Sequence, residues 1–345
     1  FETERATKYG SLEKGLQDAA AQTAKLASST EGLRSLLDNS RARGQWGERM
    51  ADDILRASGL QEGTQYLKNR ALDTSTSAPA LRAALLALLR VAQAAQPSMA
   101  LIHQFAARAL EIADAAVPRG DEVADLRAHL AHSCAAERQD LAAATFAVAH
   151  QALALIEERE PWIATLSASR TVCDAMLAAR RAGLAPRALV AEGRPGREGR
   201  AMAATLAAAG IPVWLVVDAA LPLLLSQARM VWIGADAVTD QGVVNKIGSF
   251  AVAIAAREHS VPVYALATRR KFLPATTAAL RIVEMPPSEV WKHPAEGVLP
   301  RNVYFESVPL ALLRGVVVEN AVLGASEVAT TARERALPDE LAGTP

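Results

Sequence analysis

The chain has 345 residues, of which 51% are hydrophobic and 4% aromatic, a composition typical of a soluble globular protein with many Ala/Leu-rich helices. Its 37 basic and 37 acidic residues cancel, so no global field attracts nucleic acid, and nucleic acid is not an expected partner. The longest apolar runs are interrupted by charge or proline before the roughly 18 residues that a membrane span needs, so no membrane partner is expected.

The two cysteines lie far apart in the sequence and outside any metal-ligand spacing. We expect Cys134 and Cys173 to be core thiols in a reducing, cytoplasmic environment. No metal site and no cofactor are predicted.

The first 80 residues contain a helical segment followed by a linker. Leucines recur at near-helical spacing over residues 8–60 among Gln, Lys, Glu and Ser, and no proline occurs before Pro79. The small, polar run LDTSTSAPA follows at residues 72–80. The pattern predicts an extra helical segment over residues 1–72 and a linker over 73–80.

Residues 81–160 form an Ala/Leu-rich helical region. Breaks at Pro97 and at the run PRGDE, residues 118–122, divide it into three or four helices that we expect to pack together as one domain.

Residues 161–330 alternate between short apolar runs and helical stretches of 10 to 15 residues, which predicts βαβ units around a parallel sheet. The expected fold is α/β: a helical N-terminal domain, then a Rossmann-like domain, then a tail over 331–345. The expected strands are IATLS, RALVAE, PVWLVV, RMVWIG, PVYALA and LRIVE, and the expected helices include 168–182, 198–209 and 245–258.

The run AEGRPGREGR, residues 191–200, follows one of these strands and precedes a helix. Its glycines allow a tight turn with free backbone N–H groups, and the helix N-terminus favours anions. Arg194, Arg197 and Arg200 add donors suited to phosphate. An ordinary loop with solvated arginines is the alternative.

Two further runs are expected at the same edge of the sheet. Asp236 directly follows a strand, where its carboxylate can act as a general acid or base or hold a ligand hydroxyl; a turn or helix cap is the alternative. Asn245 and Lys246 are expected to open the next helix, where a lysine beside free N–H groups makes an anion site. The alternative for Lys246 is an ordinary surface lysine.

The ordered set EGRPGREGR, GIPVWLVVDAA, GADAV, GVVNKIGSFAVAIAA, VPVYALATRRKFLP and YFESVPLALLRGVVVE resembles the translation initiation factor 2B alpha/beta/delta subunit family over residues 80–330. That family includes isomerases of ribose 1,5-bisphosphate and of 5-methylthioribose 1-phosphate. The resemblance implies a homodimer formed through the C-terminal domain and a phosphorylated sugar or nucleotide as ligand.

The resemblance also implies roles for particular residues. Asp236 matches the isomerases' catalytic aspartate, but Ser167 stands where they carry a cysteine, and Gln96 stands where an arginine is expected. A serine hydroxyl is a far weaker acid than a thiol, which weakens the case for proton transfer. The resemblance implies phosphate contacts from Arg194, Asn245 and Lys246, sugar contacts from Asp218 and Asp236, and loop-bracing roles for Glu192 and Glu306.

Residues 1–72 carry a second resemblance. The run NSRARGQWGERMADDILRASGLQEGTQY is similar to the start of the nuclease-like domain of RmuC-type DNA recombination proteins. The chain then passes into LDTSTSAPA without the further acidic and lysine residues of such a nuclease, so Glu48 lacks metal-binding partners and no nuclease activity is expected.

Three functions therefore remain after the sequence is read. The first is a sugar-phosphate isomerase that uses Asp236. The second, favoured by Ser167 and Gln96, is a non-catalytic regulatory subunit that senses a sugar phosphate or nucleotide and binds a protein partner. The third is a role in DNA recombination through the N-terminal segment.

Overall fold

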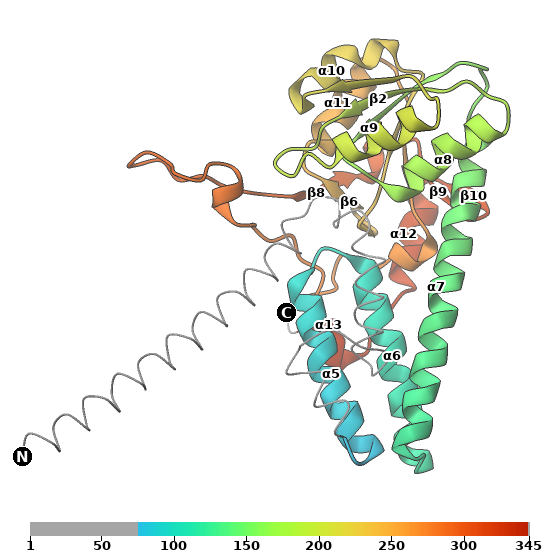
Figure 1. Ribbon diagram of the computed structural model, residues 1–345, viewed down its shortest axis with the longest axis vertical. Coiled ribbons are helices and arrows are strands. Elements are labelled where there is room, and N and C mark those ends of the chain that lie inside the picture. The colour runs from blue at the N-terminus through green and yellow to red at the C-terminus, as the bar shows by residue number, and fades with distance from the viewer. Residues whose placement is uncertain (1–74, 344–345) are drawn as a thin grey trace, which may run out of the picture. The chain divides into compact units, whose positions relative to one another are not determined.

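The computed structural model describes residues 75–343 (Figure 1). The predicted N-terminal helical segment, residues 1–72, and the first two residues of the predicted linker lie outside these residues, and a helix begins within the predicted linker, at Ala78. Three long helices follow one another: α5 (Ala78–Ala95), α6 (Ala100–Arg119) and α7 (Val123–Leu153). Helix α5 begins where the Ser77 side chain accepts a hydrogen bond from the backbone N–H of Ala80, with Pro79 in the first turn.

The apolar residues of α5 recur every four positions and form one buried face. Leu81, Leu85 and Leu89 are at most 1% exposed and pack in one core cluster with Ile102 and Leu110 of α6. Among residues 75–343, α5 is also the one helix that is long and apolar enough to pass for a membrane span. The burial of its leucines against α6 is the arrangement of a core helix.

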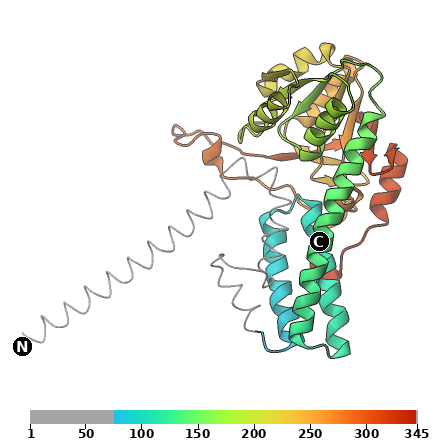
Figure 2. The same cartoon turned by 45° about the vertical axis from the view of Figure 1, so that its right-hand side comes forward.

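Helix α7 takes part in two cores. Leu126 and Leu130 near its start pack with α5 and α6, whereas Val148 and Ala149 near its end pack against the sheet. The green ribbon of α7 can be followed from the helices to the sheet in Figure 2. The helical and α/β parts of residues 75–343 are thus joined by a continuous helix.

A seven-stranded sheet forms the second part of the fold. It is parallel except for its last pair, β9 and β10. Its spatial order is β10 (Ala321–Leu323), β9 (Gly315–Val318), β7 (Val263–Leu266), β4 (Met230–Ile233), β1 (Trp162–Leu166), β2 (Arg187–Ala191) and β3 (Val213–Val216).

Helices cover both faces of this sheet. The end of α7, α8 (Arg170–Arg181) and α9 (Gly199–Ala208) pack on one face. Helices α10 (Leu221–Leu224), α11 (Ser249–Glu258) and α12 (Ala325–Arg333) pack on the other. The predicted Rossmann-like arrangement is confirmed.

A second, three-stranded antiparallel sheet was not expected from the sequence. It consists of β5 (Ala237–Val238), β6 (Gly242–Lys246) and β8 (Phe305–Pro309). The prediction that a helix begins at Asn245 is therefore wrong: Asn245 and Lys246 end β6, and α11 begins at Ser249. The buried β-branched pair Val243 and Val244 favours a strand, and Gly248, at φ 100°, turns the chain into the helix.

The strand predicted at LRIVE, residues 280–284, is also wrong. Apart from one isolated bridge between Glu284 and Val303, this segment has no strand partner. Ile282 and Val283 are about 40% exposed. They lie at the base of an arm over residues 285–301 that projects from the rest of the chain in Figures 1 and 2. The prolines at 286 and 287 remove the N–H donors that a sheet would need.

The end of the described chain returns to the three long helices. In the short helix α13 (Asp339–Ala342), Leu341 is 1% exposed within the α5 and α6 core. Arg82 bonds the carboxylates of Asp114 and Glu340. As predicted, the cysteines are core thiols: Cys134 is buried beside Phe105, and Cys173 is partly buried against the sheet-side core.

Replacing Leu89 with alanine should lower the free energy of unfolding by about 3 kcal/mol, because the cavity lies in a fully packed helix interface. Val91 lies on the same helix and is 46% exposed, so Val91→Ala should change it by less than about 0.5 kcal/mol. Urea denaturation of both variants checks this, and equal losses would contradict the packing described.

Candidate functional site

The candidate site lies where the direction of the sheet order reverses. From β1 the chain builds β2 and β3 to one side, and it then crosses to place β4 on the other side of β1. In open α/β sheets the crevice at the carboxyl ends of two such strands is the usual ligand site. Here those ends are Ser167, after β1, and Gly234 to Asp236, after β4.

Ser167 is held in an unusual conformation at the end of β1. Its φ is 64°, in the left-handed region, and its N–H donates to the carbonyl of Ala191 at 3.1 Å. Gly193 packs directly on it: a Cβ added to Gly193 would lie 2.8 Å from the Ser167 Oγ. Only glycine allows the two loops to come this close, and the resulting strain at a strand end is typical of functional sites.

A buried ion pair lies beside this serine. The Lys246 Nζ is 3.1 and 3.2 Å from the two carboxylate oxygens of Glu198, and both side chains are less than 10% exposed. The Ser167 Oγ lies 3.4 Å from the Glu198 Oε2. The Tyr304 ring lies 4.6 Å from the Lys246 Nζ, as in a cation–π contact. Residues that directly follow β1, precede α9, end β6 and precede β8 therefore meet in one cluster.

Asp236 completes the charge cluster. Burial of its carboxyl group raises the pKa of Asp236 to about 6, opposed by the positive charges of Lys271 and Lys246 and reinforced by the negative charge of Glu198. Its backbone joins the two parts of the fold, because its N–H donates to Val244 and its carbonyl accepts from Ala100 at the start of α6. This carboxyl group can exchange protons near neutral pH.

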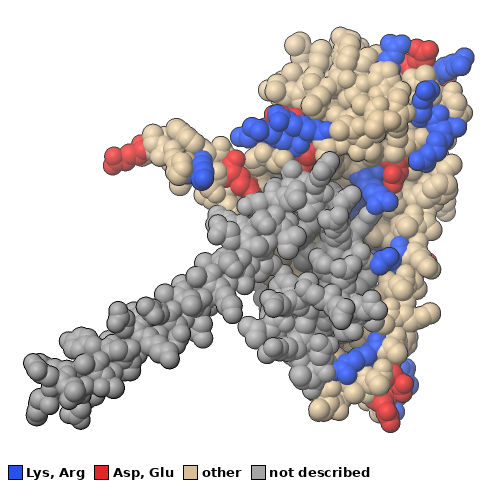
Figure 3. Space-filling model, in the orientation of Figure 1, with Lys and Arg blue, Asp and Glu red and all other residues tan. Residues whose placement is uncertain are grey.

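The predicted arginine loop lies at the rim of the cluster. Arg194, Arg197 and Arg200 are all exposed, and Figure 3 shows basic side chains gathered beside the segment that precedes α9. The backbone N–H groups of the loop are less available than expected, because those of Gly193 and Arg194 donate to the Asp218 carboxylate at 2.7 and 2.6 Å. These two backbone N–H groups are therefore already paired, whereas the three guanidinium groups lie at the surface.

Several predicted residues brace the loops. The sequence places Asp218 against the sugar, whereas both of its oxygens accept bonds from the arginine loop. Arg200 reaches back to Glu192 at 2.7 Å. Glu306 accepts from the N–H of Phe250 at 2.8 Å. The bracing predicted for Glu192 and Glu306 is confirmed.

Asn245 is buried at the turn between β6 and α11. Its Nδ2 donates to the Ser249 Oγ at 2.8 Å, and Ser249 in turn donates to the carbonyl of Lys246 at 2.6 Å. These bonds fix the backbone on which Lys246 stands. Gln96 is the C-cap residue of α5, and its backbone N–H donates to the carbonyl of Ala92.

Sequence reasoning missed three members of the cluster: Glu198, Lys271 and Tyr304. Glu198 lies in the run EGRPGREGR, directly before the first residue of α9. An acidic residue at that position usually interacts with the helix dipole, so the sequence indicates no other role for it. Lys271, whose Nζ donates to the carbonyl of Ala235 at 2.7 Å, follows β7 in the run ATRRKFLP. Nothing in the sequence places Tyr304 near Lys246, because their contact depends on the pairing of β6 with β8 in the small sheet, which was not predicted.

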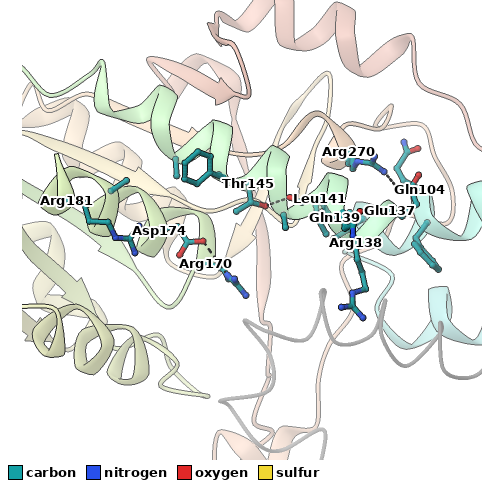
Figure 4. A pocket seen from close by; sticks show the side chains of 16 residues that line it. Gln104, Glu137, Arg138, Gln139, Leu141, Thr145, Arg170, Asp174, Arg181 and Arg270 are labelled. Atoms are coloured by element: carbon teal, nitrogen blue, oxygen red, sulfur yellow. Dashed lines mark hydrogen bonds and ion pairs between the residues drawn. The ribbon is translucent and has the colours of Figure 1, made fainter. Parts of the chain in front are cut away.

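A separate cavity of about 680 Å³ lies along α7 (Figure 4). None of the sequence-predicted site residues lines it. Two of its basic side chains lie beside carboxylates: Arg270 pairs with Glu137, and Arg170 lies 3.4 Å from Asp174. Within residues 75–343 no group of three or more His, Cys, Asp or Glu side chains is placed to hold a metal ion.

Comparison with protein families gives two matches. The model of the initiation factor 2 subunit family matches residues 60–325, which is most of the chain. The model of the RmuC family matches residues 1–89, of which the structure describes only the last part.

Curated relatives carry two kinds of name. A putative translation initiation factor eIF-2B subunit 2-like protein of Pyrococcus furiosus is 34% identical over 47% of this chain and 57% of its own length. A methylthioribose-1-phosphate isomerase of Synechococcus is 33% identical over 44% and 49%. A ribose 1,5-bisphosphate isomerase of Methanocaldococcus jannaschii is 35% identical over 37% and 43%. The chain thus spans about half the length of these relatives.

Solved structures support the same fold. The translation initiation factor eIF-2B of Pyrococcus horikoshii superposes with a TM-score of 0.62 at 25% identity, covering 79% of this chain and 96% of that one.

The raised pKa of Asp236 predicts a specific pH dependence of stability. The folded protein favours the protonated carboxyl group. Its contribution to the free energy of unfolding is therefore greatest below pH 3.8 and is lost as the pH rises through about 6. Relative to Asp236→Asn, the wild-type protein should lose up to about 3 kcal/mol of unfolding free energy across this range. Denaturant titrations of both proteins from pH 4 to 7.5 measure the difference, and a constant difference would contradict the shift.

Proposed function

Because this chain belongs to the initiation factor 2 subunit family, we propose that it binds a phosphorylated sugar between the ends of β1 and β4 and interconverts its aldose and ketose forms. The observation that carries the proposal is Asp236, a partly buried residue whose carboxyl group has a pKa raised by desolvation to about 6, beside a second carboxylate and two lysines. Aldose–ketose isomerisation needs an acid and a base that exchange protons with neighbouring atoms of the sugar.

The charges of the site fit a phosphorylated ligand. Arg194 and Arg197 are exposed at the rim with guanidinium groups suited to phosphate oxygens. Lys246 and Lys271 lie deeper, close enough to lower the pKa of Asp236 by their charge. A ligand phosphate at the rim leaves the sugar carbons to face the carboxyl groups.

The relatives agree with this class of ligand. Two of them are named as isomerases of a phosphorylated pentose or its methylthio derivative. By the resemblance of the sequence motifs, Ser167 stands where such isomerases carry a cysteine, so the proposal assigns proton transfer to carboxyl groups.

A second candidate function is a non-catalytic one. Ser167 and Gln96 depart from the isomerase pattern, and other relatives are named as translation initiation factor subunits. In that case the same cluster binds a sugar phosphate or a nucleotide without converting it, and the protein acts on a protein partner.

Ligand binding and turnover separate these functions. The full chain should gain several degrees of thermal stability with millimolar ribose 1,5-bisphosphate or 5-methylthioribose 1-phosphate, because a ligand at 100 times its Kd adds about 2.7 kcal/mol. Asp236→Asn should abolish turnover of the same compounds. Stabilisation without turnover in the wild-type protein would establish the second function, and no stabilisation by either compound or by AMP would contradict both.

We also propose that the protein is a homodimer formed through the edge of the large sheet. Within residues 75–343, strand β3 is paired on one side only and forms an edge of the sheet. Trp214, Leu215 and Val217 are 44 to 59% exposed there, and Leu223 on the adjacent α10 is 76% exposed. An apolar patch on an open edge strand is a poor surface for a monomer, because it invites association with another chain.

Sedimentation velocity tests the dimer. The double variant Val217→Glu/Leu223→Glu should sediment as a monomer at concentrations where the wild-type protein is a dimer, because two charges would be buried at the interface. Val91→Glu, at a position on α5 that is 46% exposed, should leave the wild-type state unchanged. A wild-type monomer at every concentration would contradict the proposal.

A further inference from the structure

Glu198 has a position that its place in the sequence does not explain. A glutamate directly before a helix is usually a solvated partner of the helix dipole. Glu198 is instead buried, with a side chain only 7% exposed, and it points at Lys246 and Ser167 from the carboxyl end of the sheet. Burying a carboxylate is costly, and a retained buried charge calls for an explanation in packing, specificity or chemistry.

The neighbouring residues fix this position closely. Gly199 follows Glu198, and a Cβ at Gly199 would lie 2.2 Å from the carbonyl of Ala191, so the start of α9 packs directly on the end of β2. The N–H of Gly199 donates to the carbonyl of Glu192 at 2.9 Å. Glycine at this position lets the helix approach the sheet and brings the preceding carboxylate over the end of β1.

The two carboxyl groups of the cluster have different surroundings. The Glu198 carboxylate is paired with the Lys246 ammonium at 3.1 Å. Asp236 has no ion-pair contact of that kind among residues 75–343, and burial is the largest influence on its pKa. Two carboxyl groups in different environments are the usual arrangement of an acid and a base. Glu198, held by the Lys246 ammonium group beside the Ser167 hydroxyl group, is placed to act as the base, and Asp236 is placed to act as the acid.

We propose that Glu198 is the general base of this site and replaces the cysteine that the related isomerases carry at the position of Ser167. The proposal rests on the proposed sugar-phosphate isomerase function. It assigns to Ser167 the smaller role of a hydroxyl group that contacts the base at 3.4 Å.

The proton transfers balance without a further reactant. Glu198 removes the proton from C2 of the sugar 1-phosphate ring while the C1–ring oxygen bond breaks and the Asp236 carboxyl group protonates the departing ring oxygen, which gives an open-chain enol with the phosphate still on the C1 oxygen. Glu198 then returns a proton to C1, and Asp236 recovers one from the C2 hydroxyl group, whose oxygen becomes the carbonyl of the ketose 1-phosphate. No electron donor or acceptor is needed, and both residues end as they began.

The test compares three variants of the full chain with ribose 1,5-bisphosphate and 5-methylthioribose 1-phosphate as probes. Glu198→Gln should lower turnover by about 10² to 10⁴-fold, the usual contribution of a general base, while thermal shift still reports binding. Ser167→Ala should lower turnover by less than about tenfold. Glu327→Gln, a charge removal in the first turn of α12, should leave turnover unchanged.

Solvent isotope exchange separates proton transfer from positioning. In D₂O the wild-type protein should place deuterium on the sugar carbon, and Glu198→Gln should not. Glu198→Asp keeps a charge opposite Lys246 and so protects the fold, but it retracts the carboxylate, so exchange should be slow and present. If Glu198→Gln does not fold, exchange by Glu198→Asp at the wild-type rate would by itself overturn the proposal.

The failures of the two proposals look different. Wild-type turnover that persists in Glu198→Gln and disappears in Ser167→Ala would overturn the role of Glu198 and leave the isomerase function intact. Binding without turnover or exchange in the wild-type protein would also overturn the role of Glu198, while sugar-phosphate binding would stand. If the wild-type protein bound neither probe, both the proposed role of Glu198 and the proposed isomerase function would be contradicted.

Discussion

The buried ion pair between Lys246 and Glu198 is the interaction on which the rest of the site depends. It joins the small antiparallel sheet, which carries Lys246, to the start of α9, which follows the arginine loop. Breaking such a pair leaves an uncompensated buried charge at a cost of about 3–5 kcal/mol, so the loops remain closed around it. The pair also sets the local field, because Lys246 and Glu198 act in opposite directions on Asp236.

The backbone of the site is built to permit this closeness. Gly193 sits on Ser167, and Gly199 brings α9 against the end of β2. The carbonyl of Asp236 accepts a bond from Ala100, so the first turn of α6 is fixed to the residue that titrates. A hydrogen bond thus joins the helical part directly to Asp236, so a change that shifts α6 should also shift Asp236.

Much of the large sheet and the position of Asp236 could be predicted from the sequence, because they depend on short runs of neighbouring residues. Parallel strands buried on both faces appear as short runs of Val and Ile between helical stretches, so the large sheet, its helices and the place of Asp236 at a strand end follow from periodicity. Asn245 and Lys246 were misplaced onto a helix because the pairing of β6 with β8 joins residues about 60 positions apart. The burial of Glu198 was not predicted for a related reason: its partner Lys246 lies on β6, and neither the burial nor the pairing is visible in the run EGRPGREGR.

The account depends most directly on the protonation of Asp236 in the folded protein without ligand. Carbon-13 labelling of the aspartate carboxyl groups, with Asp236 assigned by the signal missing from Asp236→Asn, gives its titration midpoint by NMR. A midpoint near pH 6 is the predicted result. A midpoint at or below the ordinary value of 3.8 would mean that the carboxylate is well solvated or strongly paired, and the carboxyl group proposed to donate a proton would not exist at neutral pH.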